Sequence, residues 1–125
     1  EDINARFAPA EHRFGIHAGQ IETAMMLHLA PASVRMSQAR HWPSSAQERA
    51  ARYPLLGNGK SAKMGWAMQD YNPAGAVGNA AAATADKGRA LVDAAGLQLA
   101  RMLAEVVALP PLLPEPPMPA GSAGS

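Results

Sequence analysis

The clearest hydrophobic pattern lies in residues 82–108. Large apolar side chains recur there three or four positions apart, and most charged residues lie between them, which is the pattern of an amphipathic helix. Thr84 is a typical N-cap, and Asp86 in the first turn suits the positive end of the helix dipole. Pro110 and Pro111 end the helix. The apolar stripe consists of Val92, Ala95, Leu99, Met102, Leu103 and Val106.

A shorter apolar pattern predicts a second helix over residues 20–29. Four side chains recur at helical spacing, and Pro31 stands where such a helix would already have ended. Two glycines border the preceding segment, which indicates a strand end or a loop. We therefore expect His17 in a loop directly before the helix and Glu22 in its first turn. The spaced side chains are Ile21, Met25, Met26 and Leu29.

The remaining segments are predicted to be less regular. Residues 1–14 are polar and irregular. Turn residues are dense in residues 33–79, which leaves room for a short helix at 47–53 and one short strand. Residues 109–125 are rich in proline and then in glycine and serine, which predicts an extended, disordered tail. Residues 1–108 are thus expected to make up the one domain.

The composition describes a small unit with a modest core. Of the 125 residues, 48% are hydrophobic, but many of these are alanine and 5% of the chain is aromatic, so little apolar area is available per residue. This favours a piece of a larger protein. The net charge of +1, from 11 basic and 10 acidic residues, does not provide the basic surface that nucleic-acid binding needs.

Cysteine content and hydropathy indicate the cellular compartment in which the protein is expected. The sequence contains no cysteine, which excludes disulfides, thiolate metal sites and a cysteine nucleophile, and a cytoplasmic protein is expected. No apolar run approaches the roughly 20 residues that cross a bilayer, and the start Glu1-Asp2 is unlike a signal peptide. We therefore expect neither nucleic acid nor a membrane as a partner.

The residue best placed for chemistry is His17. A loop bordered by glycines exposes an imidazole and lets a substrate approach the backbone, and imidazole exchanges a proton near neutral pH. Backbone amides at the helix start, at residues 19–21, can face a carbonyl oxygen or an anion. A plainer interpretation is also possible, in which His17 bonds to backbone and Glu22 only complements the helix dipole. The residues alone favour this plainer interpretation.

The residues do not predict a metal site. His28 is six positions from Glu22 and therefore lies on a different face of the helix. His12 and His41 have no partner at metal-binding spacing. A catalytic metal needs about three protein ligands, so no metal ligand is assigned in this chain.

Four segments resemble the creatininase family of amidohydrolases. His-Ala-Gly-Gln-Ile-Glu-Thr at 17–23 is similar to that family's His-Ala/Gly-Gly-x-x-Glu-Thr-Ser signature. Three later segments follow in the family's order and with roughly its spacing, so the resemblance covers residues 14–108. These segments are Pro-Ala-Ser-Val at 31–34, Gly-Ala-Val-Gly-Asn at 75–79 and Ala-Thr-Ala-Asp-Lys-Gly at 83–88.

The resemblance implies roles for the residues of the signature. His17 takes the place of the family's proton-transferring histidine, and Glu22 that of a carboxylate that lines or supports the active site. Gly19 and Gln20 are expected to contact the substrate. Ala18 stands where some relatives carry glycine, and Gln20 replaces what is often an acidic residue.

The resemblance also implies a fold and a cofactor. The expected class is α/β, as the C-terminal part of a three-layer fold with a mainly parallel central sheet and a long C-terminal helix. Family members hold two divalent metals, zinc or manganese, on an N-terminal half whose Glu-x-His-Gly-x-His-Leu-Pro and Asn-Gly-His motifs do not occur here. The chain is therefore expected to need that missing N-terminal half, or a second copy in a homo-oligomer, as its partner.

The implied function is hydrolysis of a carbon–nitrogen bond. The chain would form part of a metal-dependent amidohydrolase in which metal-bound hydroxide attacks the carbonyl of a small cyclic or linear amide and His17 passes a proton to the departing nitrogen. The alternative is a catalytically inactive fragment, or a binding or structural subunit, that retains the family's packing. The residues do not identify the substrate.

Overall fold

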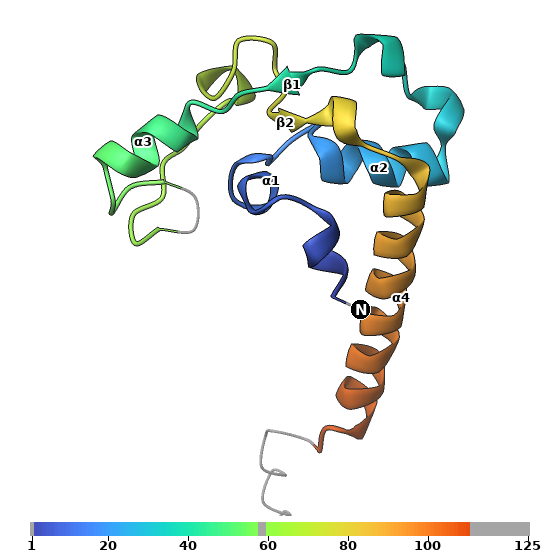
Figure 1. Ribbon diagram of the computed structural model, residues 1–125. Coiled ribbons are helices and arrows are strands. Elements are labelled where there is room, and N and C mark those ends of the chain that lie inside the picture. The colour runs from blue at the N-terminus through green and yellow to red at the C-terminus, as the bar shows by residue number, and fades with distance from the viewer. Residues whose placement is uncertain (1, 58–59, 111–125) are drawn as a thin grey trace, which may run out of the picture.

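The computed structural model describes residues 2–57 and 60–110, which are mostly helical. The two longest helices, α2 and α4, lie where the periodic patterns predict them (Figure 1). The elements in chain order are η1 (Ile3–Arg6), α1 (Pro9–Phe14), α2 (Gln20–Leu29), η2 (Pro31–Ser33), η3 (Met36–Gln38), β1 (His41–Trp42), α3 (Ala46–Arg52), η4 (Met68–Asp70), β2 (Gly78–Asn79), η5 (Ala80–Ala82) and α4 (Ala85–Ala108).

The expected α/β class with a mainly parallel central sheet is wrong for the described residues. They contain one sheet of two antiparallel strands, in which His41 of β1 pairs with Asn79 of β2 and Trp42 with Gly78. The sequence explains why the strands are so short. Between residues 30 and 80 the β-branched residues are Val34 and Val77, so few side chains there favour an extended, pleated backbone.

Two local expectations are also settled by the structure. The segment 1–14 is not irregular, because it contains η1 and α1, and Pro9 begins α1 at a position that suits proline. The short helix expected at 47–53 is confirmed as α3. The predicted tail at 109–125 falls outside the described residues from position 111 onward.

The small core lies where α2 crosses the N-terminal end of α4 (Figure 1). Phe7, Ala24 and Ala83 are buried there, and partly buried aliphatic side chains pack against them. Gly88 of α4 faces the backbone of Ala24, so closely that a Cβ at position 88 would overlap the carbonyl oxygen of Ala24. The two helices approach each other because both positions are small. The packed aliphatic residues are Ile21, Leu27 and Leu91.

Gly88→Ala is expected to lower the free energy of unfolding by roughly 1–3 kcal/mol, because the added methyl must push α4 away from α2. Gly96→Ala is the matched control in the same helix, since a Cβ at position 96 meets no atom within 4 Å. That control is expected to raise stability by about 1 kcal/mol through helix propensity alone. Urea unfolding of both variants measures the difference, and equal effects would contradict the close crossing.

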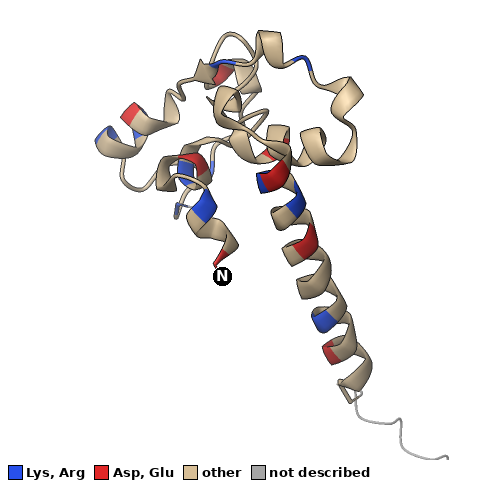
Figure 2. Ribbon diagram, turned by 45° about the vertical axis from the view of Figure 1, so that its right-hand side comes forward, with Lys and Arg blue, Asp and Glu red and all other residues tan. Residues whose placement is uncertain are grey.

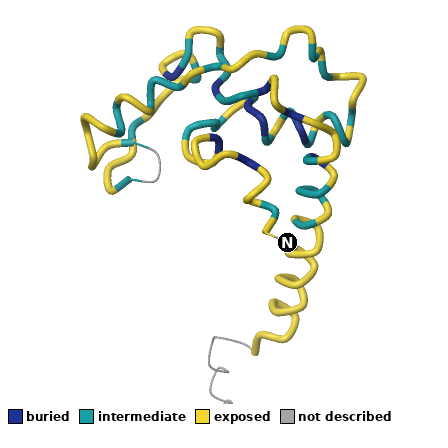
Figure 3. The backbone as a smooth tube through the Cα atoms, in the orientation of Figure 1, coloured by how far each residue is buried: buried dark blue, intermediate teal, exposed yellow. Residues whose placement is uncertain are grey.

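The second half of α4 extends away from this core with its apolar stripe uncovered (Figures 1 and 3). Thr84 caps the helix as predicted, because its hydroxyl oxygen accepts a hydrogen bond from the Lys87 N–H at 3.3 Å. Charged residues are spread along the helix between the apolar positions (Figure 2). Within the described residues, no helix is both long and apolar enough to cross a membrane. The exposed stripe residues include Leu99, Met102, Leu103 and Val106.

Candidate functional site

The loop between α1 and α2 carries His17 and is fixed by its backbone. The His17 carbonyl oxygen accepts a hydrogen bond from the Val77 N–H at 2.9 Å, and the two residues form an isolated antiparallel bridge. Val77 is fully buried. The loop is therefore anchored to a buried part of the domain, although His17 itself is exposed, as the sequence predicts.

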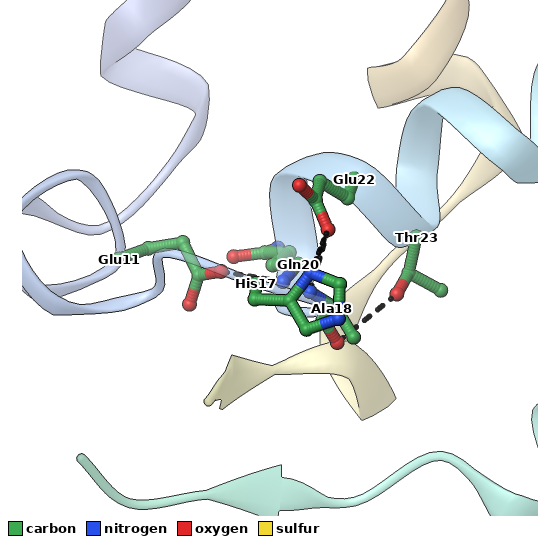
Figure 4. A network of polar contacts seen from close by, with 6 residues as sticks. All are labelled: Glu11, His17, Ala18, Gln20, Glu22 and Thr23. Atoms are coloured by element: carbon green, nitrogen blue, oxygen red, sulfur yellow. Dashed lines mark hydrogen bonds and ion pairs between the residues drawn. The ribbon is translucent and has the colours of Figure 1, made fainter. Parts of the chain in front are cut away.

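The imidazole of His17 lies beside the carboxylate of Glu22, which is in the first turn of α2 (Figure 4). The His17 Nδ1 atom is 3.4 Å from Glu22 Oε2, and the two side chains are 55% and 47% exposed. A carboxylate beside Nδ1 favours a proton on that nitrogen and fixes the orientation of the ring. The Nε2 atom is then the one that can exchange a proton with a bound molecule.

The same carboxylate also holds the backbone of Ala18. The Ala18 N–H donates to Glu22 Oε2 at 2.6 Å, and the Thr23 hydroxyl donates to the Ala18 carbonyl oxygen at 3.5 Å (Figure 4). Ala18 has a φ of 53°, in the left-handed region that residues other than glycine rarely adopt. One oxygen atom of Glu22, Oε2, thus bonds to the strained backbone at Ala18 and also contacts the imidazole of His17.

A second carboxylate, that of Glu11, supports the site from the opposite side (Figure 4). Glu11 is 6% exposed. Its Oε1 accepts from the backbone N–H of Gln20 at 2.5 Å, and its Oε2 accepts from the backbone N–H of Asn79 at 2.9 Å. One buried side chain therefore ties α1 to the start of α2 and to β2, and it stabilises the positive end of α2.

Three glycines make room for the Glu11 carboxylate. A Cβ at Gly15 would lie 2.5 Å from Glu11 Cδ, and one at Gly78 would lie 2.6 Å from Glu11 Oε1. A Cβ at Gly19 would lie closer still to the same carboxylate, and Gly78 also has a φ of 112°. Sequence reasoning missed Glu11, and the signal available for it was this set of glycines, which marks a close approach without naming the approaching residue.

Gly19 and Gln20, the expected substrate contacts, are both buried. The Gln20 backbone N–H donates to Glu11, and its side-chain amide nitrogen donates to the Ala82 carbonyl oxygen at 2.8 Å. The structure thus gives both of these Gln20 donors a partner within the chain. The role of Gly19 and Gln20 in substrate binding stays a prediction.

A hollow of about 350 Å³ opens beside Glu22. Ala18, Glu22 and Thr23 line it together with Arg35 and Gln38. It therefore combines an acid, a cation and an amide next to the His17 loop. A small polar molecule in this hollow would lie beside the carboxylate that holds the imidazole.

The described residues do not fit a metal centre. They contain no group of three or more histidine, cysteine, aspartate or glutamate side chains that could hold an ion. Among the described residues, His17 and Glu22 form a pair without a third ligand, and the Nε2 atom of His12 is 2.9 Å from the Asn4 carbonyl oxygen. A catalytic metal needs about three protein ligands.

A comparison with known protein families matches most of the chain. The family model described as "Creatininase: Creatinine amidohydrolase" matches residues 1–103, a range that includes the His17 loop and most of α4. The chain matched no curated protein and no solved structure.

Proposed function

Because the chain belongs to the creatininase family, we propose that it supplies the proton-transferring histidine of an amidohydrolase that cleaves a carbon–nitrogen bond. One observation carries the proposal, namely the contact of His17 Nδ1 with Glu22 Oε2 in a loop fixed to the buried Val77. The substrate class is a small cyclic or linear amide, which we place against the exposed imidazole of His17, next to the hollow that Ala18 and Glu22 line.

The role proposed for His17 is the transfer of one proton to the leaving group. In amide hydrolysis a water oxygen bonds to the carbonyl carbon, the carbon–nitrogen bond breaks, and the departing nitrogen gains a proton that came from water. A protonated Nε2 of His17 donates that proton, and Nε2 then takes up another proton from solvent. Glu22 does not touch the reacting atoms in this scheme. Its Oε2 lies beside Nδ1 and fixes the orientation of the imidazole ring.

The activation of water lies outside the described residues. Enzymes of this family are generally metal-dependent, and the His17 and Glu22 pair does not form a site for such an ion. We propose that two divalent metals, zinc or manganese, are held by a further segment, on the same polypeptide or on a partner. The present chain then contributes the C-terminal portion of the catalytic domain.

The second candidate function is a binding or structural subunit without catalytic activity. The missing group of metal ligands in the described residues favours it. The two candidates differ in what should accompany the chain in the genome. A neighbouring coding region for the metal-binding half supports the enzyme, and a chain that occurs without any such half supports the inactive subunit.

Glu22→Gln tests the arrangement at the site. The amide oxygen of glutamine can still accept from the Ala18 N–H, so the loop should keep its shape, but the negative charge beside His17 is lost. We expect kcat to fall by about 10-fold with little change in KM, measured on a panel of small amides with the assembled enzyme.

Two further variants control for structure. Glu105→Gln removes an exposed charge from α4 and should leave kcat unchanged. Glu22→Ala loses both the charge and the acceptor for Ala18, so it should lose activity and stability together. If Glu22→Gln changed KM alone, Glu22 would bind substrate and would not position His17.

A further inference from the structure

A second cavity shares no lining residue with the hollow beside Glu22 and lies between α1, α3 and the segment around Tyr71. Its volume is about 150 Å³, and neither His17 nor Glu22 lines it. Its walls are mainly apolar and aromatic. The residues with the largest apolar side chains are Phe14, Ile16, Tyr53, Leu56, Met64 and Tyr71.

The charged groups around this cavity all have the same sign. Arg13, Arg49 and Lys60 line it, and no acidic side chain is among the described residues that do. Arg49 belongs to α3 and is half-buried, whereas Arg13 of α1 is exposed at the edge. Three cations around a space with low-polarity walls attract an anion, since the walls weaken the screening of charge by water.

One hydrogen-bond donor in the cavity wall has no partner among the described residues. The Nη1 atom of Arg49 donates to the Asp70 carbonyl oxygen at 3.3 Å, and the guanidinium carbon lies 4.8 Å from the centroid of the Tyr71 ring. These contacts fix the guanidinium plane. The Nη2 atom is buried, and none of the described residues provides an acceptor for it. A buried guanidinium donor left in this way is costly, and a carboxylate oxygen is the acceptor that matches it best.

We propose that this cavity binds a small organic carboxylate whose apolar body is about the size of one ring. The carboxylate accepts hydrogen bonds from Arg49 Nη2, with Arg13 and Lys60 adding favourable charge, and the apolar body packs against the aromatic walls. Ile16 lines the cavity and directly precedes His17, so an occupant touches the loop that carries the histidine. The proposal concerns binding and does not depend on hydrolysis by this chain.

Benzoate is the probe, and titration calorimetry with ligand-observed NMR on the full 125-residue chain is the measurement. We expect saturable binding of benzoate, binding of the neutral isostere benzamide weaker by at least about 10-fold, and weak binding of inorganic phosphate. Equal affinity for benzamide would overturn the role of the cations. Equal affinity for phosphate would overturn the role of the apolar walls, and no saturable binding of benzoate would overturn the site.

Two arginine variants separate the site from general charge. Arg49→Gln should weaken benzoate binding by at least about 10-fold. Arg101→Gln removes the same charge from an exposed residue of α4 that does not line the cavity, and should change the affinity less than about 2-fold. A similar loss in both variants would show non-specific attraction and would contradict the assignment.

Two more variants decide the question if Arg49→Gln does not fold. Ala50→Met places a longer apolar side chain in the cavity wall without changing the charge, and it should abolish benzoate binding. Arg13→Gln alters an exposed residue at the cavity edge and should weaken binding several-fold. Unchanged benzoate affinity in Ala50→Met would place the ligand elsewhere and would overturn the proposal.

Discussion

In the assembled enzyme, His17→Ala is expected to lower kcat by roughly 100-fold or more, while the metal content stays the same. The expected size is that of losing a general acid or base whose proton transfer occurs in the transition state. Among the described residues, the side chain of His17 pairs with Glu22 and belongs to no group of side chains that could hold a metal ion. Measuring the turnover of a small amide and the metal content of the same preparation gives kcat and the metal stoichiometry.

The leaving group provides a sharper test of the same assignment. An activated anilide, whose departing nitrogen needs little protonation, should lose much less rate in His17→Ala than an alkyl amide does. His41→Ala is the control, because His41 is an exposed histidine whose pairing with Asn79 is made by backbone. If His17→Ala lost its metals, and lost activity for that reason alone, the proton-transfer role would be wrong.

The second large effect is expected on reconstitution. The 125-residue chain alone should neither bind two divalent metals tightly nor hydrolyse amides, and it should gain both properties when the N-terminal half of a creatininase-family enzyme is supplied in trans. The physical reason is that the described residues contain no metal-ligand group, while the second half of α4 keeps an apolar stripe uncovered. Metal analysis and an amidase assay, with and without the co-expressed half, measure both gains.

Because the apolar stripe of α4 is exposed, reconstitution can also be tested without an activity assay. Leu103 is 53% exposed, and its neighbours on the stripe are similarly uncovered, so the lone chain should self-associate in solution. Sedimentation should show the association disappear when the partner half binds. A His17→Ala chain in the same mixture should restore metal binding without turnover. Stoichiometric zinc or manganese together with turnover in the lone chain would disprove the half-enzyme proposal.

The helical part of the fold could be predicted because its determinants are local. The 3.6-residue period, Thr84 as N-cap and the proline at position 31 fixed both long helices to within a few residues. The same local signals placed His17 before α2 and Glu22 in its first turn. Spacing along a helix was enough for these predictions.

Contacts between distant residues could not be predicted in this way. Glu11 bonds to Gln20 and to Asn79, at separations of 9 and 68 residues, and no periodicity connects those positions. The positive φ of Ala18 was equally hidden, because alanine gives no signal for the left-handed region. The resemblance also led to an expected parallel sheet, whereas the described residues supply two strands of two residues each.

The bonds of Glu11 have a consequence for the order of folding. Closing the contact between Glu11 and Asn79 confines 68 residues of chain, and the backbone contact of His17 with Val77 closes a loop of similar length. Such closures cost entropy that local helix formation does not, so they form late. In a partly folded chain, α2 can therefore already be formed while the loop that carries His17 has not yet reached its native position. The loop that carries His17 takes its final geometry only when the segment around Val77 has docked, so the proton-transfer role proposed for His17 depends on one of the last contacts that the folding chain makes.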